Sequence, residues 1–185
     1  MEFLKNIRSI FILLAAIVSA APIRAQAFKE SDLKAVFLYH LAQFVDWPPE
    51  AFPAAETPLV IGILGADPFG KALDEVAQNE MVKNRKLIVH RFRTVDEVKL
   101  CHILFVSQSE GPRLDQVLAA LKGRNILLVG DTDGFAQRGG AVRFLTEKNK
   151  IRLRINTDSV KAAGLTISSK LLRAAELVTD KEAKP

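Results

Sequence analysis

Three segments of this chain combine side chains that could do chemistry. Residues 65–70, 107–111 and 130–135 each follow a short apolar run. The first places glycines and an aspartate before a helical stretch, where main-chain amides can bind an anion. The second offers serine hydroxyls as nucleophiles, and the third offers two aspartates to a cation.

Each pattern also has a structural interpretation, which the spacing favours. The glycines of the first segment lack the spacing of a dinucleotide-binding loop, so Asp67 and Pro68 are better explained as the start of a helix. Asp131 and Asp133 lack the later glutamate of a calcium loop and are typical of a turn. No Gly-x-Ser-x-Gly elbow surrounds the serines. The segments therefore predict turns rather than a reaction centre.

The three histidines do not complete a site. His40 lies in a predicted helix, whereas His90 and His102 lie in or beside predicted strands. None has a second ligand four residues away, as a helical metal site requires. The sequence contains no nucleophile–base pair and no cofactor motif. It predicts a protein that is not an enzyme and that uses neither a cofactor nor a metal.

The elements that position these segments alternate along the chain. Short apolar runs predict strands at residues 59–64, 87–89, 102–106 and 126–129. Helical spacing predicts helices at residues 69–76 and 114–121. Strands that alternate with helices are typical of a parallel sheet. We therefore expect a single three-layer α/β/α domain with a largely parallel sheet.

Parallel strands end at the same edge of a sheet, which is where ligands usually bind. The three segments are expected to meet at this edge. The side chains that we expect to line it are Asp67, Phe69, Glu110, Asp131 and Phe135. They form a candidate surface for a partner or a small ligand.

A helix is predicted at residues 33–44, with Asp32 as its cap and a Trp-Pro-Pro sequence after its end. Its apolar residues extend nearly all the way round, so we expect burial on more than one side. It would lie inside the domain or between two copies. The candidates for a dimer or partner surface are Phe37, Tyr39 and Phe44.

The C-terminal part is predicted to form an antiparallel hairpin from residues 142–144 and 151–155, followed by a last helix at residues 169–178. Alternation along the hairpin places three basic residues on one face, namely Arg143, Arg152 and Arg154. Solvated charges at a sheet edge are one interpretation of this stripe. Contact with an acidic partner surface is the other.

The N-terminus has the pattern of a secretory signal peptide. Basic residues precede an apolar run at residues 10–21, and an Ala-x-Ala site ends at Ala27. A membrane anchor is the alternative, but the run is shorter than the roughly 20 residues that span a bilayer. We expect cleavage between Ala27 and Phe28. This leaves residues 28–185, with a core at about residues 32–178, as one periplasmic domain.

Charge and cysteine content argue against nucleic-acid binding and against an intrachain disulfide. The formal net charge is +5, but the basic residues are dispersed, so nucleic-acid binding is not predicted. Cys101 is the sole cysteine of the sequence, so no intrachain disulfide can form. Because Cys101 begins an apolar strand, a buried and inert thiol is expected. An intermolecular disulfide is the alternative.

Several segments resemble a known family. They run in order along the chain: 34–39 (KAVFLY), 44–48 (FVDWP), 61–70 (IGILGADPFG), 101–106 (CHILFV), 129–131 (VGD), 134–136 (GFA), 139–140 (GG), 155–156 (IN) and 163–172 (AGLTISSKLL). Each is modest alone, but together they resemble the YfiR family of periplasmic proteins. The resemblance covers nearly all of residues 28–185.

The resemblance implies a regulatory function. The best-known member of the family represses an inner-membrane diguanylate cyclase by binding its periplasmic sensor region, which keeps cyclic di-GMP low. An outer-membrane lipoprotein can sequester that repressor, and homodimers are usual for it. Related domains are the sensory part of membrane histidine kinases. The implied partner here is the periplasmic domain of such a cyclase or kinase.

This chain departs from the family at one point. The best-known repressor has paired cysteines, whereas Cys101 stands alone, so redox control by intrachain bridges is not expected. The leading hypothesis is a non-enzymatic periplasmic regulator that represses cyclic di-GMP signalling. A small-ligand sensor that acts on a membrane histidine kinase is the second hypothesis. A hydrolase is the third, and it rests only on the α/β order and the loop serines and aspartates.

Overall fold

The computed structural model describes residues 29–148 and 150–179. The predicted signal peptide and its cleavage site between Ala27 and Phe28 lie outside these residues. Within them, no helix combines the length and the apolar character that crossing a membrane requires.

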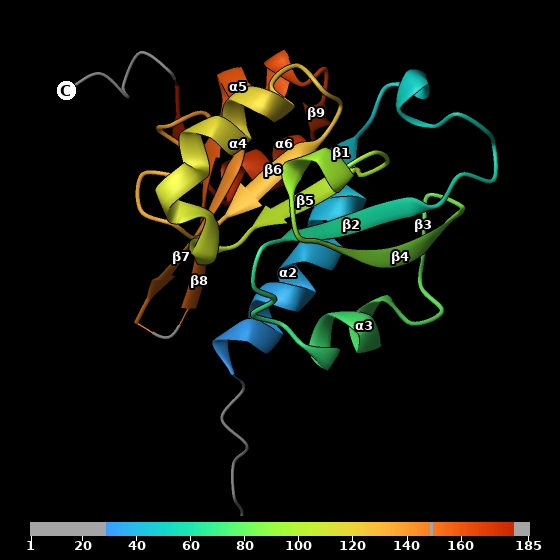
Figure 1. The fold of residues 1–185 in the computed structure, drawn as a ribbon, viewed down its shortest axis with the longest axis horizontal. Helices are drawn as coiled ribbons and strands as arrows, with labels where there is room; N and C mark the ends of the chain where they lie inside the picture. Colours follow the sequence, from blue (N-terminus) through green and yellow to red (C-terminus); the bar gives the residue numbers. More distant parts are fainter. Residues whose placement is uncertain (1–28, 149, 180–185) are drawn as a thin grey trace, which may run out of the picture.

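Within the described residues, eight strands form one sheet in the order β10-β8-β7-β6-β5-β2-β4-β3 (Figure 1). The strands are β2 (Leu59–Leu64), β3 (Met81–Val82), β4 (Arg85–Phe92), β5 (Ile103–Val106), β6 (Leu127–Gly130), β7 (Val142–Glu147), β8 (Lys150–Asn156) and β10 (Glu176–Val178). The pairs β4–β2, β2–β5, β5–β6, β6–β7 and β8–β10 are parallel. The pairs β7–β8 and β3–β4 are antiparallel. The fold is therefore mixed α/β, with the predicted hairpin at β7–β8.

Helices pack on both faces of this sheet. They are α2 (Glu30–Phe44), α3 (Lys71–Ala77), α4 (Leu114–Leu121), α5 (Thr157–Ala162) and α6 (Ser169–Arg173). In Figure 1, α2 passes behind the sheet and α4 lies in front of it. The remaining elements are the short helices η2 (Pro49–Ala51), η3 (Val95–Glu97) and η4 (Gln108–Arg113), and the strands β1 (Val45–Asp46) and β9 (Thr166–Ile167), which pair antiparallel.

The hydrophobic core is divided by the sheet. In β5, Ile103 and Phe105 join the cluster that includes residues of α2 and α3, whereas Leu104 and Val106 join the cluster that includes residues of α4. Strands buried on both faces are continuously apolar rather than alternating. This explains why the central strands appear in the sequence as short unbroken apolar runs.

Helix α2 differs from its prediction. It begins at Glu30, its N-cap is Lys29, and no side chain caps it, so the predicted role of Asp32 is wrong. Leu38 and Leu41 are buried on one side, whereas Val36 is 39% exposed on the other. The helix therefore has one buried face and an exposed stripe, rather than burial on more than one side.

The end of the chain also differs from its prediction. The last helix, α6, ends at Arg173, and Glu176–Val178 forms β10 instead of continuing the helix. A tertiary contact explains this difference: β10 pairs with β8, and Glu176 lies opposite Arg154. Such a pairing readily overrides a modest helical preference.

Cys101 is buried, 6% exposed, as the first interpretation of the sequence predicts. Burial raises the pKa of its thiol to about 12. The thiol is therefore neutral and enclosed, which disfavours the intermolecular disulfide.

Candidate functional site

The candidate site is the edge where the parallel strands end. After β2 the chain continues to α3, whose buried residues join the core cluster of α2, and after β5 it continues to η4 and to α4 on the opposite face. Neighbouring strands whose connections leave in opposite directions form a topological switch point, where open α/β sheets bind ligands. The crevice expected here lies between the ends of β2 and β5.

This crevice is filled by the protein itself. Ser109 Oγ accepts a hydrogen bond from the amide of Ala66 at 2.9 Å, which ties the two loops together. Gly65 has a φ of 89°, and a Cβ there would lie 2.4 Å from Ser109 Oγ. Only glycine fits that approach without movement. The serine therefore closes the edge and has a structural role there.

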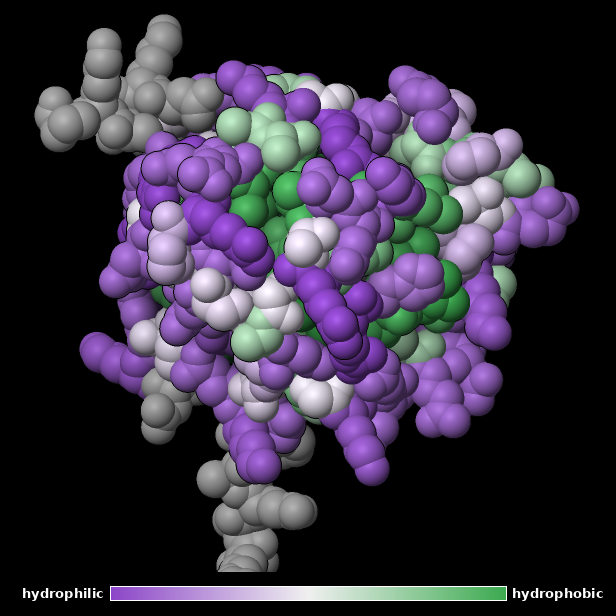
Figure 2. Space-filling view, viewed as in Figure 1, coloured by the Kyte–Doolittle hydropathy of each residue, from purple (hydrophilic) through white to green (hydrophobic). Residues whose placement is uncertain are grey.

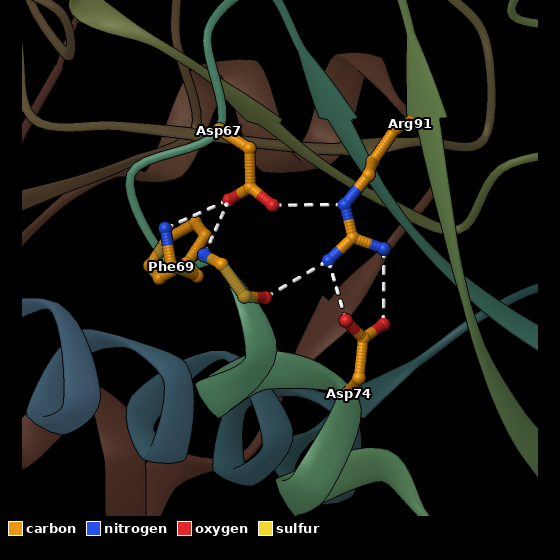
Figure 3. Close-up of polar contacts among 5 residues, drawn as sticks. Asp67, Phe69, Asp74 and Arg91 are labelled. Carbon is orange, nitrogen blue, oxygen red and sulfur yellow. Dashed lines mark hydrogen bonds and ion pairs between the residues drawn. The ribbon is translucent and has the colours of Figure 1, made fainter.

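Arg91 of β4 forms the first charged cluster on this edge (Figure 3). Its Nε donates to Asp67 at 2.8 Å, and its two terminal nitrogens donate to the carboxylate of Asp74 at 2.9 and 2.7 Å. The hydrogen bonds to Asp74 and then to Asp67 raise the pKa of Arg91 above its ordinary value, although partial burial opposes this. The guanidinium thus joins β4 to the start of α3.

Asp67 has a second task at the same place. Its Oδ1 accepts hydrogen bonds from the amides of Phe69 at 2.7 Å and Gly70 at 3.2 Å. These amides precede α3, whose N-cap is Gly70 and which has no side-chain cap. Asp67 therefore orders the turn before the helix and does not cap it, and Pro68 lies before the helix rather than in its first turn. Both oxygens of Asp67 are occupied, and no anion site remains at these two amides.

Glu110 forms the second cluster. It is 3% exposed and accepts hydrogen bonds from Arg113 at 2.5 and 2.9 Å. These hydrogen bonds raise the pKa of Arg113 above its ordinary value. Glu110 follows β5 as the sequence indicates, but it is buried instead of lining a surface, and its carboxylate is engaged by Arg113 on η4.

Asp131 belongs to the third cluster. Lys34 Nζ donates to Asp131 Oδ2 at 2.6 Å and lies 2.6 Å from Glu30 Oε1. Burial of Lys34 opposes its charge, but the hydrogen bonds to Asp131 and Glu30 prevail and raise its pKa. The hydrogen bond from Lys34 lowers the pKa of Glu30. Asp131 is therefore an internal ion-pair partner.

No cation site appears where the two loop aspartates were considered. Asp133 pairs with Arg143 on the hairpin, whereas Asp131 pairs with Lys34, so the two carboxylates serve different elements. In the part of the chain that the structure describes, no group of three or more His, Cys, Asp or Glu side chains is placed to hold a metal.

The three hairpin arginines share one face, as predicted. Arg143 lies opposite Arg154 across the β7–β8 pair, and Arg152 lies two residues from Arg154. Each pairs with a carboxylate of this chain; the partners are Asp133, Glu147 at 3.2 Å and Glu176 at 2.8 Å. Arg143 and Arg154 are largely buried, whereas the Arg152 side chain is 67% exposed. The stripe is thus neutralised, and Arg152 is its most accessible member.

Two predicted surface aromatics lie in the core. Phe69 is 4% exposed and packs edge-on against Phe105, with ring centroids 4.8 Å apart. Phe135 is 0% exposed, and its ring covers Gly130 and Gly140 so closely that neither has space for a Cβ. The expectation that Phe69 and Phe135 line a surface is therefore wrong: both rings are core residues, and truncating such a buried ring to alanine costs about 3–5 kcal/mol.

The α2 aromatics lie at the border of the core. Phe37 packs against Phe144 with ring centroids 6.2 Å apart, and the Tyr39 hydroxyl donates to Glu80 at 2.8 Å. Phe44 is half-buried at the end of the helix. All three are partly accessible, which leaves their role at a dimer or partner surface a prediction.

A cavity of about 360 Å³ lies elsewhere, between α4 and α5. Its floor is apolar and its rim is mostly cationic; the lining includes Leu118, Leu121, Ile126 and Leu128 below and Lys122, Arg124 and Arg138 above. Sequence reasoning missed this cavity because distant segments form it. Its size and apolar floor are those of a small-molecule pocket.

The described residues therefore offer binding surfaces whose charges are mostly paired internally. The sequence model of the YfiR/HmsC-like family matches residues 31–176. The chain belongs to the YfiR/HmsC-like family. None of the curated proteins compared with it matches significantly. This family consists in general of regulators rather than enzymes, and membership supports a periplasmic regulatory role for this chain.

Proposed function

We propose that this protein is a periplasmic, non-enzymatic regulator that binds the periplasmic domain of an inner-membrane diguanylate cyclase and represses cyclic di-GMP signalling. The observation that carries the proposal is the family match over residues 31–176. The predicted signal peptide is consistent with it. A homodimer and sequestration by an outer-membrane lipoprotein belong to the same proposal.

The architecture suits a regulator that acts as a rigid body. The crevice at the strand ends is filled by Ser109, and the surrounding loops are joined by ion pairs such as Lys34–Asp131. A preorganised surface loses little conformational freedom on binding. Repression then follows if this surface binds the inactive cyclase more tightly than the active one, by about 1.4 kcal/mol for each tenfold shift.

A pull-down tests the partner. The mature chain, tagged at its C-terminus, is incubated with detergent-solubilised membranes of the source cells, and the bound proteins are identified by mass spectrometry. We expect a cyclase or kinase with a periplasmic domain. Its reproducible absence with folded bait would contradict the proposal. The control bait is an unrelated periplasmic protein with the same tag.

A deletion strain tests the consequence. Loss of a repressor should raise cyclic di-GMP and increase biofilm, and expression of the exported chain should restore both. Unchanged cyclic di-GMP in a clean deletion would remove the cyclase from the proposal.

Arg152 is the residue we propose first for contact with an acidic partner surface. Its side chain is the most exposed of the hairpin stripe, and Glu147 is its one ion-pair partner among the described residues. Arg152→Glu should weaken capture of the membrane partner several-fold, as expected for an exposed charge at a binding interface. The matched control is Lys161→Glu, an exposed charge on α5. Equal capture by both variants would exclude the hairpin face.

A small-ligand sensor that acts on a membrane histidine kinase is the second candidate function. The cavity between α4 and α5 favours it, because an apolar floor beneath Lys122 and Arg124 suits a small organic anion. A thermal-shift screen of amino acids, vitamins and nucleotides tests this candidate. Leu128→Trp, which fills the cavity floor, should abolish any shift, and a screen without a raised midpoint would end it.

A further inference from the structure

One edge of the main sheet has no neighbouring strand along most of its length. Strand β4 pairs with β2 from Leu87 to Phe92. On its other side, β3 pairs only with Arg85 and Lys86. Within the described residues, the outer edge of β4 from Ile88 to Phe92 is therefore unpaired.

The hydrogen bonds at both ends of this stretch show which main-chain groups face outward. The Phe92 carbonyl accepts from the amide of Gly65, which follows β2, so Phe92 faces β2. The Leu87 amide donates to the carbonyl of Glu80, on the β3 side. Because main-chain groups alternate in direction along a strand, Val89 and Arg91 point their N–H and C=O groups away from β2.

A groove runs along this edge. It has a volume of about 480 Å³ and lies between α3 and β4, with Asp74, Glu75 and Ala77 on the helix and Leu87, Ile88 and Val89 on the strand among its lining residues. Figure 1 shows α3 beside β4, and Figure 2 shows hydrophobic residues (green) at the surface over β2 and β4. The edge is thus open to an extended chain.

Natural proteins usually protect such an edge with charges or by covering it. Arg91 is the obvious guard, but Asp67 and Asp74 hold its guanidinium against the start of α3. The opposite edge strand of the sheet, Glu176–Val178, is shorter. The β4 edge therefore offers the longer template for strand addition.

We infer that the outer edge of β4 binds an extended segment of the membrane partner by strand addition. The inference rests on the proposed function and names the contact. Main-chain hydrogen bonds to Val89 and Arg91 supply the register. An apolar side chain of the segment packs against Ala77 and Val89 in the groove, and polar residues alternate with it. A single extended chain fits in the groove between β4 and α3. A second copy that paired through the same edge would bring its own α3 against this α3, which disfavours a dimer at this edge.

Val89→Pro is the decisive variant. Proline removes only the outward N–H of residue 89 and leaves the bonds of β4 to β2 in place, which is where edge strands tolerate it. Val89→Thr is the matched control, because it keeps the N–H and the branched shape. Binding to the purified periplasmic domain of the partner identified by pull-down is measured by interferometry. We expect at least tenfold weaker binding for Val89→Pro and little change for Val89→Thr, with unchanged circular dichroism for both.

The outcomes separate the two proposals. If the wild-type chain captures no membrane partner, the proposed function fails and the inference fails with it. If Val89→Pro binds as tightly as the wild type, the edge is not the contact, although the function stands. Light scattering adds a third outcome, because a wild-type dimer that Val89→Pro dissociates would assign the edge to a second copy and overturn the partner assignment.

Hydrogen exchange of the wild-type chain decides the question even if Val89→Pro does not fold. Adding the partner domain should slow exchange at the amides of Val89 and Arg91. The Leu87 amide, already bonded to Glu80, is the internal control and should change little. Unchanged exchange at Val89 and Arg91 in a saturated complex would overturn the inference.

Discussion

The two ends of the parallel strands are held by different forces. At the carboxyl ends, loops and helices are joined by ion pairs, with Arg91, Lys34 and Arg113 each bound to carboxylates. At the amino ends, the connection between β1 and β2 is held by the buried neutral ring of His102, by aromatic contacts and by hydrogen bonds from Arg85 to its carbonyls. The first arrangement should respond to salt, and the second should respond to mild acid.

His102 is the centre of the amino-end cluster. It is 0% exposed; its Nδ1 accepts from the amide of Val60 at 3.0 Å, and its Nε2 donates to the carbonyl of Ala51 at 3.1 Å. Phe52 stacks on the imidazole with ring centroids 4.4 Å apart. The Arg85 guanidinium carbon lies 3.8 Å from the centroid of the Phe52 ring. Both imidazole nitrogens are used, so the neutral ring fixes the segment against the sheet.

Removing this ring should have the largest effect. His102→Ala leaves the buried Val60 amide without its acceptor and opens a cavity beneath Phe52. We expect it to lower the free energy of unfolding by about 3 kcal/mol. Urea denaturation, followed by the fluorescence of Trp47, measures it. His90→Ala, at an exposed position on β4, is the control and should change stability little. Equal losses in both variants would show that the amino end has no special role.

The best-buried ion pair of the carboxyl end should come next. Lys34→Met removes a cation that is 7% exposed and leaves Asp131 and Glu30 without their partner. We expect the uncompensated charge of Asp131 to lower the free energy of unfolding by about 2 kcal/mol. The loss is smaller than for a fully enclosed carboxylate, because Asp131 keeps some contact with solvent. Thermal and urea denaturation measure the loss. Lys161→Met, on the exposed face of α5, should be neutral.

Mild acid should distinguish the two ends. Burial lowers the pKa of His102 from 6.5 to about 4, and the nearby charge of Arg85 adds to this against the hydrogen bond to Ala51. The folded state therefore binds fewer protons than the unfolded chain between these values. This part of the stability is complete above pH 6.5 and is lost as the pH falls toward 4, with a decrease of about 2 kcal/mol between pH 7 and pH 5.

The carboxyl end behaves differently over this interval. The pKa of Glu30 is lowered from 4.5 by its hydrogen bond to Lys34, so its contribution is present above pH 4.5 and is lost only below it. Urea denaturation at pH 7, 6 and 5 makes the comparison. His102→Asn should remove most of the slope, whereas Lys34→Met should keep it. A wild-type curve that is flat to pH 5 would contradict a buried neutral His102.

The sequence predicts what depends on local pattern. Residues 59–64 and 114–121 were expected as a strand and a helix, and β2 and α4 have these bounds. Apolar runs and helical spacing are local signals, so they need no knowledge of the fold. The two-residue strands β1 and β9 escaped prediction because their pairing joins distant segments.

The candidate edge shows the same limit. Asp67, Glu110 and Asp131 follow the parallel strands β2, β5 and β6, and this much depends only on where each strand ends in the sequence. Their cations were not predicted, since Lys34 meets Asp131 across 97 residues of sequence and Arg91 meets Asp67 across 24. A carboxylate in a loop looks available until its distant partner is known. One weak signal could have indicated the contact of Arg91 with α3. Arg91 lies two residues after Val89 in the same strand, so the two side chains share the face that packs toward α3.

The smallest expected effect concerns Arg91, and it tests the salt response directly. The side chain is 41% exposed, so solvent screens its pairs with Asp67 and Asp74. Arg91→Met should lower the free energy of unfolding by about 1 kcal/mol, near the upper limit for exposed pairs because the geometry with Asp74 is bidentate. Arg93→Met is the control, since Arg93 is exposed and makes no ion pair within the described residues.

Salt should then remove most of the difference between these two variants. At 1 M NaCl the screening length falls to about 3 Å, so the attraction of Arg91 for its carboxylates and the repulsion between Asp67 and Asp74 in the variant both weaken. The His102→Ala difference should persist under the same conditions, because a buried neutral hydrogen bond is not screened. If the Arg91→Met loss persisted in high salt, the guanidinium would stabilise the edge mainly by packing and hydrogen bonding, and the two strand ends would differ less in kind than their charges indicate.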